Sequence, residues 1–95
     1  MEIIGHTVEY LEDPFGLLTG ERFEFLLDLD IDEEDELYTV AGTGLKVIFA
    51  VEGSENKIAQ YNFFEKGSGK VLDFALEDDE EQMVIDYCSN HFEEA

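Results

Sequence analysis

Residues 22–31, RFEFLLDLDI, alternate between apolar and polar side chains. The apolar set is Phe23, Phe25, Leu27, Leu29 and Ile31, and most residues between them are acidic. Successive side chains of a β-strand point to opposite faces, so this pattern is typical of a strand with one buried and one exposed face. The segment therefore predicts a sheet that carries a hydrophobic core on at least one side.

Five further segments are expected to form strands or strand-like pieces of the same sheet. They are residues 3–11, 37–40, 45–51, 57–65 and 71–76, of which 37–40 is the shortest. In the first of them, Ile4, Val8 and Tyr10 fall on one side. Short turns rich in Gly, Ser and Asn separate most of these segments, which favours an antiparallel meander of five or six strands.

Residues 77–92 change to the period of a helix. An apolar arc contains Val84, Ile85, Tyr87, Cys88, His91 and Phe92. Asp78 or Asp79 is the expected N-cap, and the acidic residues around it favour the positive end of the helix dipole. We therefore predict an α+β fold, an antiparallel meander with one C-terminal amphipathic helix packed on one face, in a single domain over residues 1–95.

The charge limits the classes of partner. The chain has 25 acidic and five basic residues, a formal charge of −20 and 44% hydrophobic residues. Such a field repels nucleic acid and anionic membrane surfaces, both of which are bound through Lys and Arg. It attracts cations and basic proteins, and the apolar content predicts a folded domain rather than a disordered acidic tail.

The expected location is the cytoplasm. The only cysteine, Cys88, has no internal partner for a disulfide. We find no basic leader followed by an apolar run, and no apolar stretch that approaches the roughly 18–20 residues of a membrane span. A reducing compartment and no membrane contact are therefore predicted.

The largest group of carboxylates lies at the end of the alternating segment. It consists of Asp28, Asp30, Asp32, Glu33, Glu34, Asp35 and Glu36. The first three have the spacing of a calcium-binding EF-hand, but Glu33 stands where that loop needs Gly and Thr39 where it needs Glu. We predict no metal site here. The seven residues are either the solvated end of a strand and its connection or a surface that binds a basic protein partner.

Other constellations favour packing over chemistry. Cys88 and His91 are three apart on the apolar arc, but zinc needs further convergent ligands, and the pattern does not place His6 nearby. We expect Cys88 and His91 to be buried packing residues. We predict no catalytic residues and no cofactor. In the loop after residue 11, Phe15, Leu17 and Leu18 are expected to fold back on the core.

Residues 45–51 raise the question of a second layer, because this strand is apolar on both sides. One helix covers only one face of a sheet. Either the sheet curls towards a barrel or a second copy covers the other face, and the second option predicts a homodimer.

Two stretches, LEDPFGLLTGERFEFLLDLDIDEEDELY and LDFALEDDEE, carry a family resemblance. With them the chain resembles, nearly end to end, a small acidic family of bacilli classed as a domain of unknown function. Some members of that family carry the label pullulanase, yet 95 residues cannot hold a starch-debranching barrel of at least about 200 residues. The resemblance implies a bacterial cytosolic protein and supplies no catalytic residues.

The leading functional prediction is a non-enzymatic protein-interaction domain that uses an acidic surface. One alternative is a small-ligand-binding domain with an aromatic-rich pocket, since the chain has eight Phe and four Tyr. An enzyme with scattered carboxylate chemistry is another. A third alternative is that the acidity serves only solubility.

Overall fold

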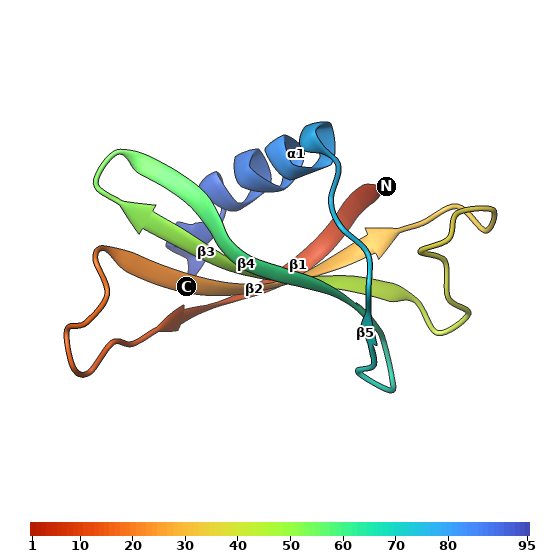
Figure 1. The fold of residues 1–95 in the computed structure, drawn as a ribbon, viewed down its shortest axis with the longest axis horizontal. Helices are drawn as coiled ribbons and strands as arrows, with labels where there is room; N and C mark the ends of the chain where they lie inside the picture. Colours follow the sequence, from red (N-terminus) through yellow and green to blue (C-terminus); the bar gives the residue numbers. More distant parts are fainter.

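The computed structural model describes residues 1–95 throughout, and it contains one sheet with one helix packed on it (Figure 1). The strands are β1 Glu2–Leu11, β2 Glu21–Asp30, β3 Thr43–Glu52, β4 Glu55–Glu65 and β5 Val71–Leu72, followed by the helix α1 Asp78–Ser89 and the 3₁₀ turn η1 Phe92–Glu94. The strands pair in sequence order, each antiparallel to the next. The predicted meander with a C-terminal helix is confirmed, with five strands.

The alternating pattern of β2 builds the core. β2 and β3 pair without a break, so Phe25 lies opposite Val47 and Leu27 opposite Leu45, and these four side chains are completely buried. β-Branched and aromatic residues fit such a pleated, half-buried surface, which explains why these segments form strands. The core therefore consists of side chains from one face of the sheet and from one helix.

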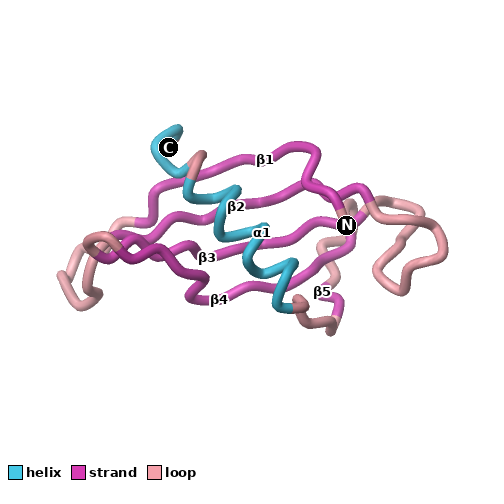
Figure 2. Tube along the Cα trace, turned by 90° about the horizontal axis from the view of Figure 1, so that it is seen from above, coloured by secondary structure: helices cyan, strands magenta, loops and turns pink.

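α1 crosses this face obliquely, from the side of β4 and β5 towards β1 (Figure 2). Val84 and Cys88 are fully buried, and Ile85, Tyr87 and Phe92 pack against the same core. The predicted apolar arc is confirmed for these residues. The N-cap is Glu77 instead of Asp78 or Asp79, and its N–H donates to the Glu80 carboxylate over 3.0 Å, as in one half of a capping box.

The predicted strand at residues 37–40 is wrong. This segment is a turn, in which the N–H of Tyr38 donates to Asp35 O and the N–H of Gly42 donates to Thr39 O. Its backbone groups are satisfied locally, so none remain for a neighbouring strand. Leu37 anchors the turn in the core while Val40 is 96% exposed.

The last predicted strand, residues 71–76, is too long. Pairing ends at Leu72, and the chain turns at once, with the N–H of Phe74 donating to Leu72 O. The chain has to leave the sheet here in order to reach the helical layer. Tyr61 of β4 holds this rising segment, because its hydroxyl accepts the N–H of Leu76 over 2.9 Å.

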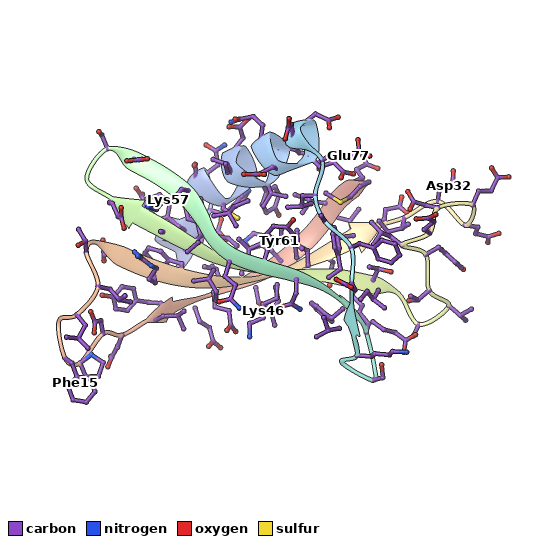
Figure 3. The ribbon with its side chains drawn as sticks, in the orientation of Figure 1. Phe15, Asp32, Lys46, Lys57, Tyr61 and Glu77 are labelled. Carbon is purple, nitrogen blue, oxygen red and sulfur yellow. The ribbon has the colours of Figure 1, made fainter.

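The face of the sheet away from α1 has no second layer, and it carries most of the positive charge. The register places Arg22, Lys46 and Lys57 on this open face, and Lys46 points away from the helix in Figure 3. The ion pairs are Arg22–Glu52, Lys57–Glu52, Lys46–Glu24 and Lys66–Asp28. Four of the five basic residues are therefore paired on or at the edge of one face.

These long side chains also cover the apolar strand beneath them. Ala50 of β3 is completely buried although it points to the open face, and its cross-strand neighbours are Arg22 and Lys57. Lys and Arg can lay their aliphatic stems on apolar surface while the charged ends stay in water. This explains how β3 is apolar on both sides in an open sheet that has not closed into a barrel.

Candidate functional site

The predicted acidic segment is divided between two parts of the fold. Asp28 and Asp30 are on β2, on the open side of the sheet, and Asp28 is bound to Lys66 over 2.6 Å. Residues 32–36 form the exposed connection that follows. Asp30 and Asp32 line a shallow hollow with Met1 and Glu2. The seven carboxylates therefore come from two parts of the fold, the end of β2 and the connection after it.

Two carboxylates of the connection shape its backbone. Asp32 accepts the N–H of Glu34 over 3.0 Å, and Asp35 accepts the N–H of Leu37 over 2.9 Å. These are Asx turns, in which the side chain replaces a backbone acceptor. Glu33, Glu34 and Glu36, in contrast, are exposed and make no side-chain hydrogen bond or ion pair.

A second group of titratable side chains forms where the two ends of the chain meet. His6 of β1, His91 after α1 and Glu94 of η1 bring potential ligand atoms within 4.8 Å of one another. His6 Nε2 lies 2.8 Å from Glu94 Oε1, and His91 Nδ1 lies 2.6 Å from Glu94 Oε2. A carboxylate only accepts hydrogen bonds, so both imidazole nitrogens donate to it.

An irregularity in β1 aims His6 at this group. Ile3 pairs with Leu29 and His6 with Leu27, so the extra residue between them is a β-bulge. The bulge lets both Ile3 and His6 point towards the helix, and Ile4 is left 65% exposed. The sequence pattern placed Ile4 on the same side of the strand as Val8 and Tyr10, which is wrong for Ile4.

Aromatic neighbours hold the two imidazole rings. Tyr87 hydroxyl lies 2.6 Å from His6 Nδ1, and the Tyr87 ring lies 4.3 Å from the His91 ring. The His6 ring also lies 5.9 Å from the ring of Phe25, which is completely buried. The position of His6 is therefore set by the core as well as by Glu94.

The environment shifts the pKa of two groups here. The hydrogen bond from His91, and then that from His6, lowers the pKa of Glu94. Burial, and then the negative charge of Glu94, raises the pKa of Tyr87. Glu94 is thus held as a carboxylate and Tyr87 as a neutral phenol, which is the arrangement that hydrogen-bonds to imidazole.

Sequence reasoning missed this group because it paired His91 with the wrong residue. Cys88 is in the core as predicted, and burial raises the pKa of its thiol to about 12. His91 is not in the core, because α1 ends at Ser89 and the chain changes direction. Its side chain is 31% exposed and faces His6 instead. The only sequence signal was the spacing of His91 and Glu94.

The loop between β1 and β2 is exposed, so the expectation that it folds back on the core is wrong. Phe15 and Leu17 are both 81% exposed, and Leu18 is 52% exposed. Phe15 projects from the far end of the hairpin in Figure 3, at the opposite end of the molecule from Asp32. Asp13 shapes the loop, accepting the N–H of Leu18 over 2.6 Å, and this bond lowers the pKa of Asp13.

The three fully buried phenylalanine rings of the interior line no pocket. Phe25, Phe49 and Phe63 are completely buried, and none of them lines a hollow of the surface. One open hollow of about 400 Å³ lies between Tyr10, Phe23 and Phe92. Small-molecule sites usually enclose most of their ligand.

Comparisons with known proteins give one match. No curated protein and no solved structure matches the chain. No helix has both the length and the apolar character needed to cross a membrane. The sequence model of a family covers residues 1–95, in agreement with the resemblance described above. The chain therefore belongs to a family of unknown function (DUF6509).

Proposed function

We propose that the chain is a non-enzymatic protein-interaction domain of the bacterial cytoplasm, and that it docks through the β1–β2 loop. The observation that carries this proposal is the exposure of Phe15, Leu17 and Leu18 at the end of one hairpin. Single exposed apolar residues are ordinary, but several together at a projecting tip are typical of a binding surface. Large aromatic side chains are also the usual anchors of protein interfaces.

Hydrogen bonds within the loop hold it in one conformation before any partner binds. Asp13 binds the N–H of Leu18, and the N–H of Gly16 donates to Asp13 O over 3.1 Å. Gly16 and Gly20 adopt positive φ values of 63° and 75°, which glycine accommodates without strain. A loop that is already shaped loses less conformational entropy on binding, so more of the contact energy is available for affinity.

The chemistry around the loop specifies the partner. Glu12 and Glu21 flank it, and four of the five basic residues of the chain are already in ion pairs on or at the edge of the open face. With a formal charge of −20, the domain is attracted to basic surfaces over a distance set by the salt concentration. The partner we propose is a protein with an apolar groove bordered by Lys and Arg.

The acidic connection is proposed as a second, electrostatic contact. Of the predicted group, Asp30, Glu33, Glu34 and Glu36 are exposed and make no side-chain hydrogen bond or ion pair, and the last three lie in the connection after β2. Asp32 and Asp35 support the turn, and Asp28 is neutralised by Lys66. We therefore expect the three glutamates to contribute to association rate and salt dependence rather than to the anchor.

The test is affinity capture from the native cell extract at low and high salt. The double variant Phe15→Ser, Leu17→Ser should abolish capture of a basic partner. The matched control is Val40→Ser, which changes an apolar residue that is 96% exposed in the connection between β2 and β3 and should leave capture unchanged. Glu33, Glu34 and Glu36→Gln should weaken capture mainly at low salt. Unchanged capture by the loop variant would overturn the docking site, and failure to capture any basic protein would favour a role of the acidity in solubility alone.

A homodimer through the open sheet face is a second proposal. This face carries paired charges of both signs around Leu26 and Ile48, so two chains of charge −20 could meet there with little repulsion. Light scattering at micromolar concentration should give the dimer mass, and Ile48→Asp should give the monomer mass, with Val40→Asp as control. A monomeric mass for the unaltered chain would exclude the dimer.

A further inference from the structure

We propose that His6, His91 and Glu94 bind a divalent transition-metal ion of the Zn²⁺ type. The inference does not depend on the proposed interaction function. It stands on the convergence of three ligands, two imidazoles and one carboxylate, from three parts of the chain: β1, the segment after α1, and η1. These are the only His, Cys, Asp or Glu side chains of the chain that gather in this way.

The donor set selects the kind of ion. Two imidazole nitrogens and one carboxylate suit Zn²⁺ and its neighbours Co²⁺, Ni²⁺ and Cu²⁺, whereas Ca²⁺ and Mg²⁺ prefer oxygen ligands alone. Ligand atoms about 2.0–2.1 Å from a tetrahedral ion lie roughly 3.3 Å apart. The present hydrogen bonds of 2.8 Å and 2.6 Å to Glu94 already hold both rings within that range of the carboxylate.

The surroundings orient the ligands as metal sites require. A metal-binding histidine usually donates its other ring N–H to a fixed acceptor. Tyr87 hydroxyl lies 2.6 Å from His6 Nδ1 and can accept that hydrogen when Nε2 binds the ion. The β-bulge and the Phe25 ring keep His6 in place, so only the more exposed partners have to adjust.

The site is open enough for an ion and a water to enter. The side chains of His6, His91 and Glu94 are 14%, 31% and 52% exposed. Exposure therefore increases from His6, next to the core, to Glu94 at the surface. Three protein ligands leave the fourth tetrahedral position for water. The charge of −20 raises the local concentration of cations around the whole molecule.

The bound ion would fasten the C-terminal turn to the edge strand. His6 is near the start of the chain and Glu94 is next to its last residue, so the ion closes a loop that spans nearly the whole domain. A ligand that binds the folded chain and not the unfolded chain raises the unfolding temperature. Zn²⁺ should therefore stabilise the protein, most of all against fraying of η1.

The experiment is a titration of the full chain with Co²⁺, read by visible absorption, followed by displacement with Zn²⁺, all in an excess of Mg²⁺. The expected result is one ion per chain and the intense absorption of tetrahedral Co²⁺. The Mg²⁺ occupies carboxylates that bind cations without specificity. Binding that the Mg²⁺ abolishes would overturn the proposal, and so would a spectrum without tetrahedral character.

Variants assign the ligands. His91→Gln and Glu94→Gln should each weaken Co²⁺ binding, and the loss should exceed the roughly 10–100-fold caused by removal of an outer partner. Tyr87→Phe removes such a partner, so the affinity should fall within that range while the tetrahedral spectrum remains. Glu93→Gln is the matched control, because this neighbour is exposed and makes no hydrogen bond. Equal effects of Glu93→Gln and Glu94→Gln would overturn the site.

The unaltered protein supplies an independent measurement. Zn²⁺ should shift the NMR signals of the imidazole rings of both His6 and His91, in the same stoichiometry as the absorption change. This measurement does not depend on whether a variant folds. Unperturbed imidazole signals at saturating Zn²⁺ would contradict the assignment.

Discussion

The imidazole ring of His6 lies 4.6 Å from that of His91, and the two rings share the carboxylate of Glu94. β1 is an edge strand, paired only with β2, and η1 is the last element of the chain. The contact therefore ties an edge strand to the C-terminal turn. The same contact creates the one place on this acidic molecule where two histidines and a carboxylate converge.

Cys88 should be chemically inert in the folded protein. Burial raises the pKa of its thiol from 9.0 to about 12, and the thiolate is the reactive form. At pH 8 we expect very slow reaction with a chromogenic disulfide reagent until the chain is unfolded in guanidinium. Rapid labelling under native conditions would contradict the burial of this residue.

The same burial should make stability depend on pH in the alkaline range. The free energy of unfolding should fall as pH rises from 9 towards 12, because the thiol of the unfolded chain loses its proton at a lower pH than the thiol of the folded chain.

Gly20 should tolerate substitution far less than Gly16. Both have positive φ, for which an L residue incurs a cost of roughly 1–2 kcal/mol. A Cβ on Gly20 would also collide with the carbonyl oxygen of Val51, whereas a Cβ on Gly16 meets nothing within 4 Å. We expect Gly20→Ala to lower the free energy of unfolding by more than about 2 kcal/mol and Gly16→Ala by about 1 kcal/mol, measured by urea denaturation. Equal losses would mean that only the backbone conformation matters.

The elements that the sequence predicts well are those whose side-chain pattern and environment agree. β2 alternates strictly and α1 has one apolar arc, and both fold as their periods indicate. Residues 37–40 have strand-forming side chains, but the Asx turn of Asp35 and the local bonds before Gly42 satisfy the backbone first. Propensity alone does not reveal that competition.

The His6 group could not be predicted for a different reason. Its geometry depends on the bulge at Ile4, which shifts the side-chain alternation of β1 by one residue. It also depends on the end of α1 at Ser89, which takes His91 out of the apolar arc. Both features depend on how the helix packs on the completed sheet, and a single sequence carries only weak signals of them.

Glu52 should contribute to the acid sensitivity of the fold. The Lys57 ammonium, and then the Arg22 guanidinium, lowers the pKa of this carboxyl below its ordinary value of 4.5. The folded state therefore binds fewer protons than the unfolded state in this range. The stabilisation is present above about pH 4.5 and is lost as pH falls through the lower folded pKa.

The comparison of two variants isolates that contribution. Glu52→Gln should remove part of the decline in stability below pH 5, whereas Glu55→Gln, at an exposed position without an ion pair in the same hairpin, should leave the decline unchanged. The measurement is the unfolding temperature as a function of pH, at fixed salt because exposed ion pairs are screened. Identical acid profiles for the two variants would show that the ion pairs of Glu52 do not stabilise the fold.

Tyr61 should stabilise the connection between the sheet and the helix. Its hydroxyl accepts the N–H of Leu76 in the segment that rises from β5 to α1, and Leu76 is buried. Tyr61→Phe removes the acceptor and leaves that N–H without a protein partner, at a cost of about 1–2 kcal/mol. Tyr38→Phe is the matched control, because the Tyr38 hydroxyl makes no hydrogen bond and its side chain is 38% exposed. Hydrogen exchange should show faster exchange of the Leu76 amide in Tyr61→Phe alone, and equal exchange in both variants would place the support of this segment elsewhere.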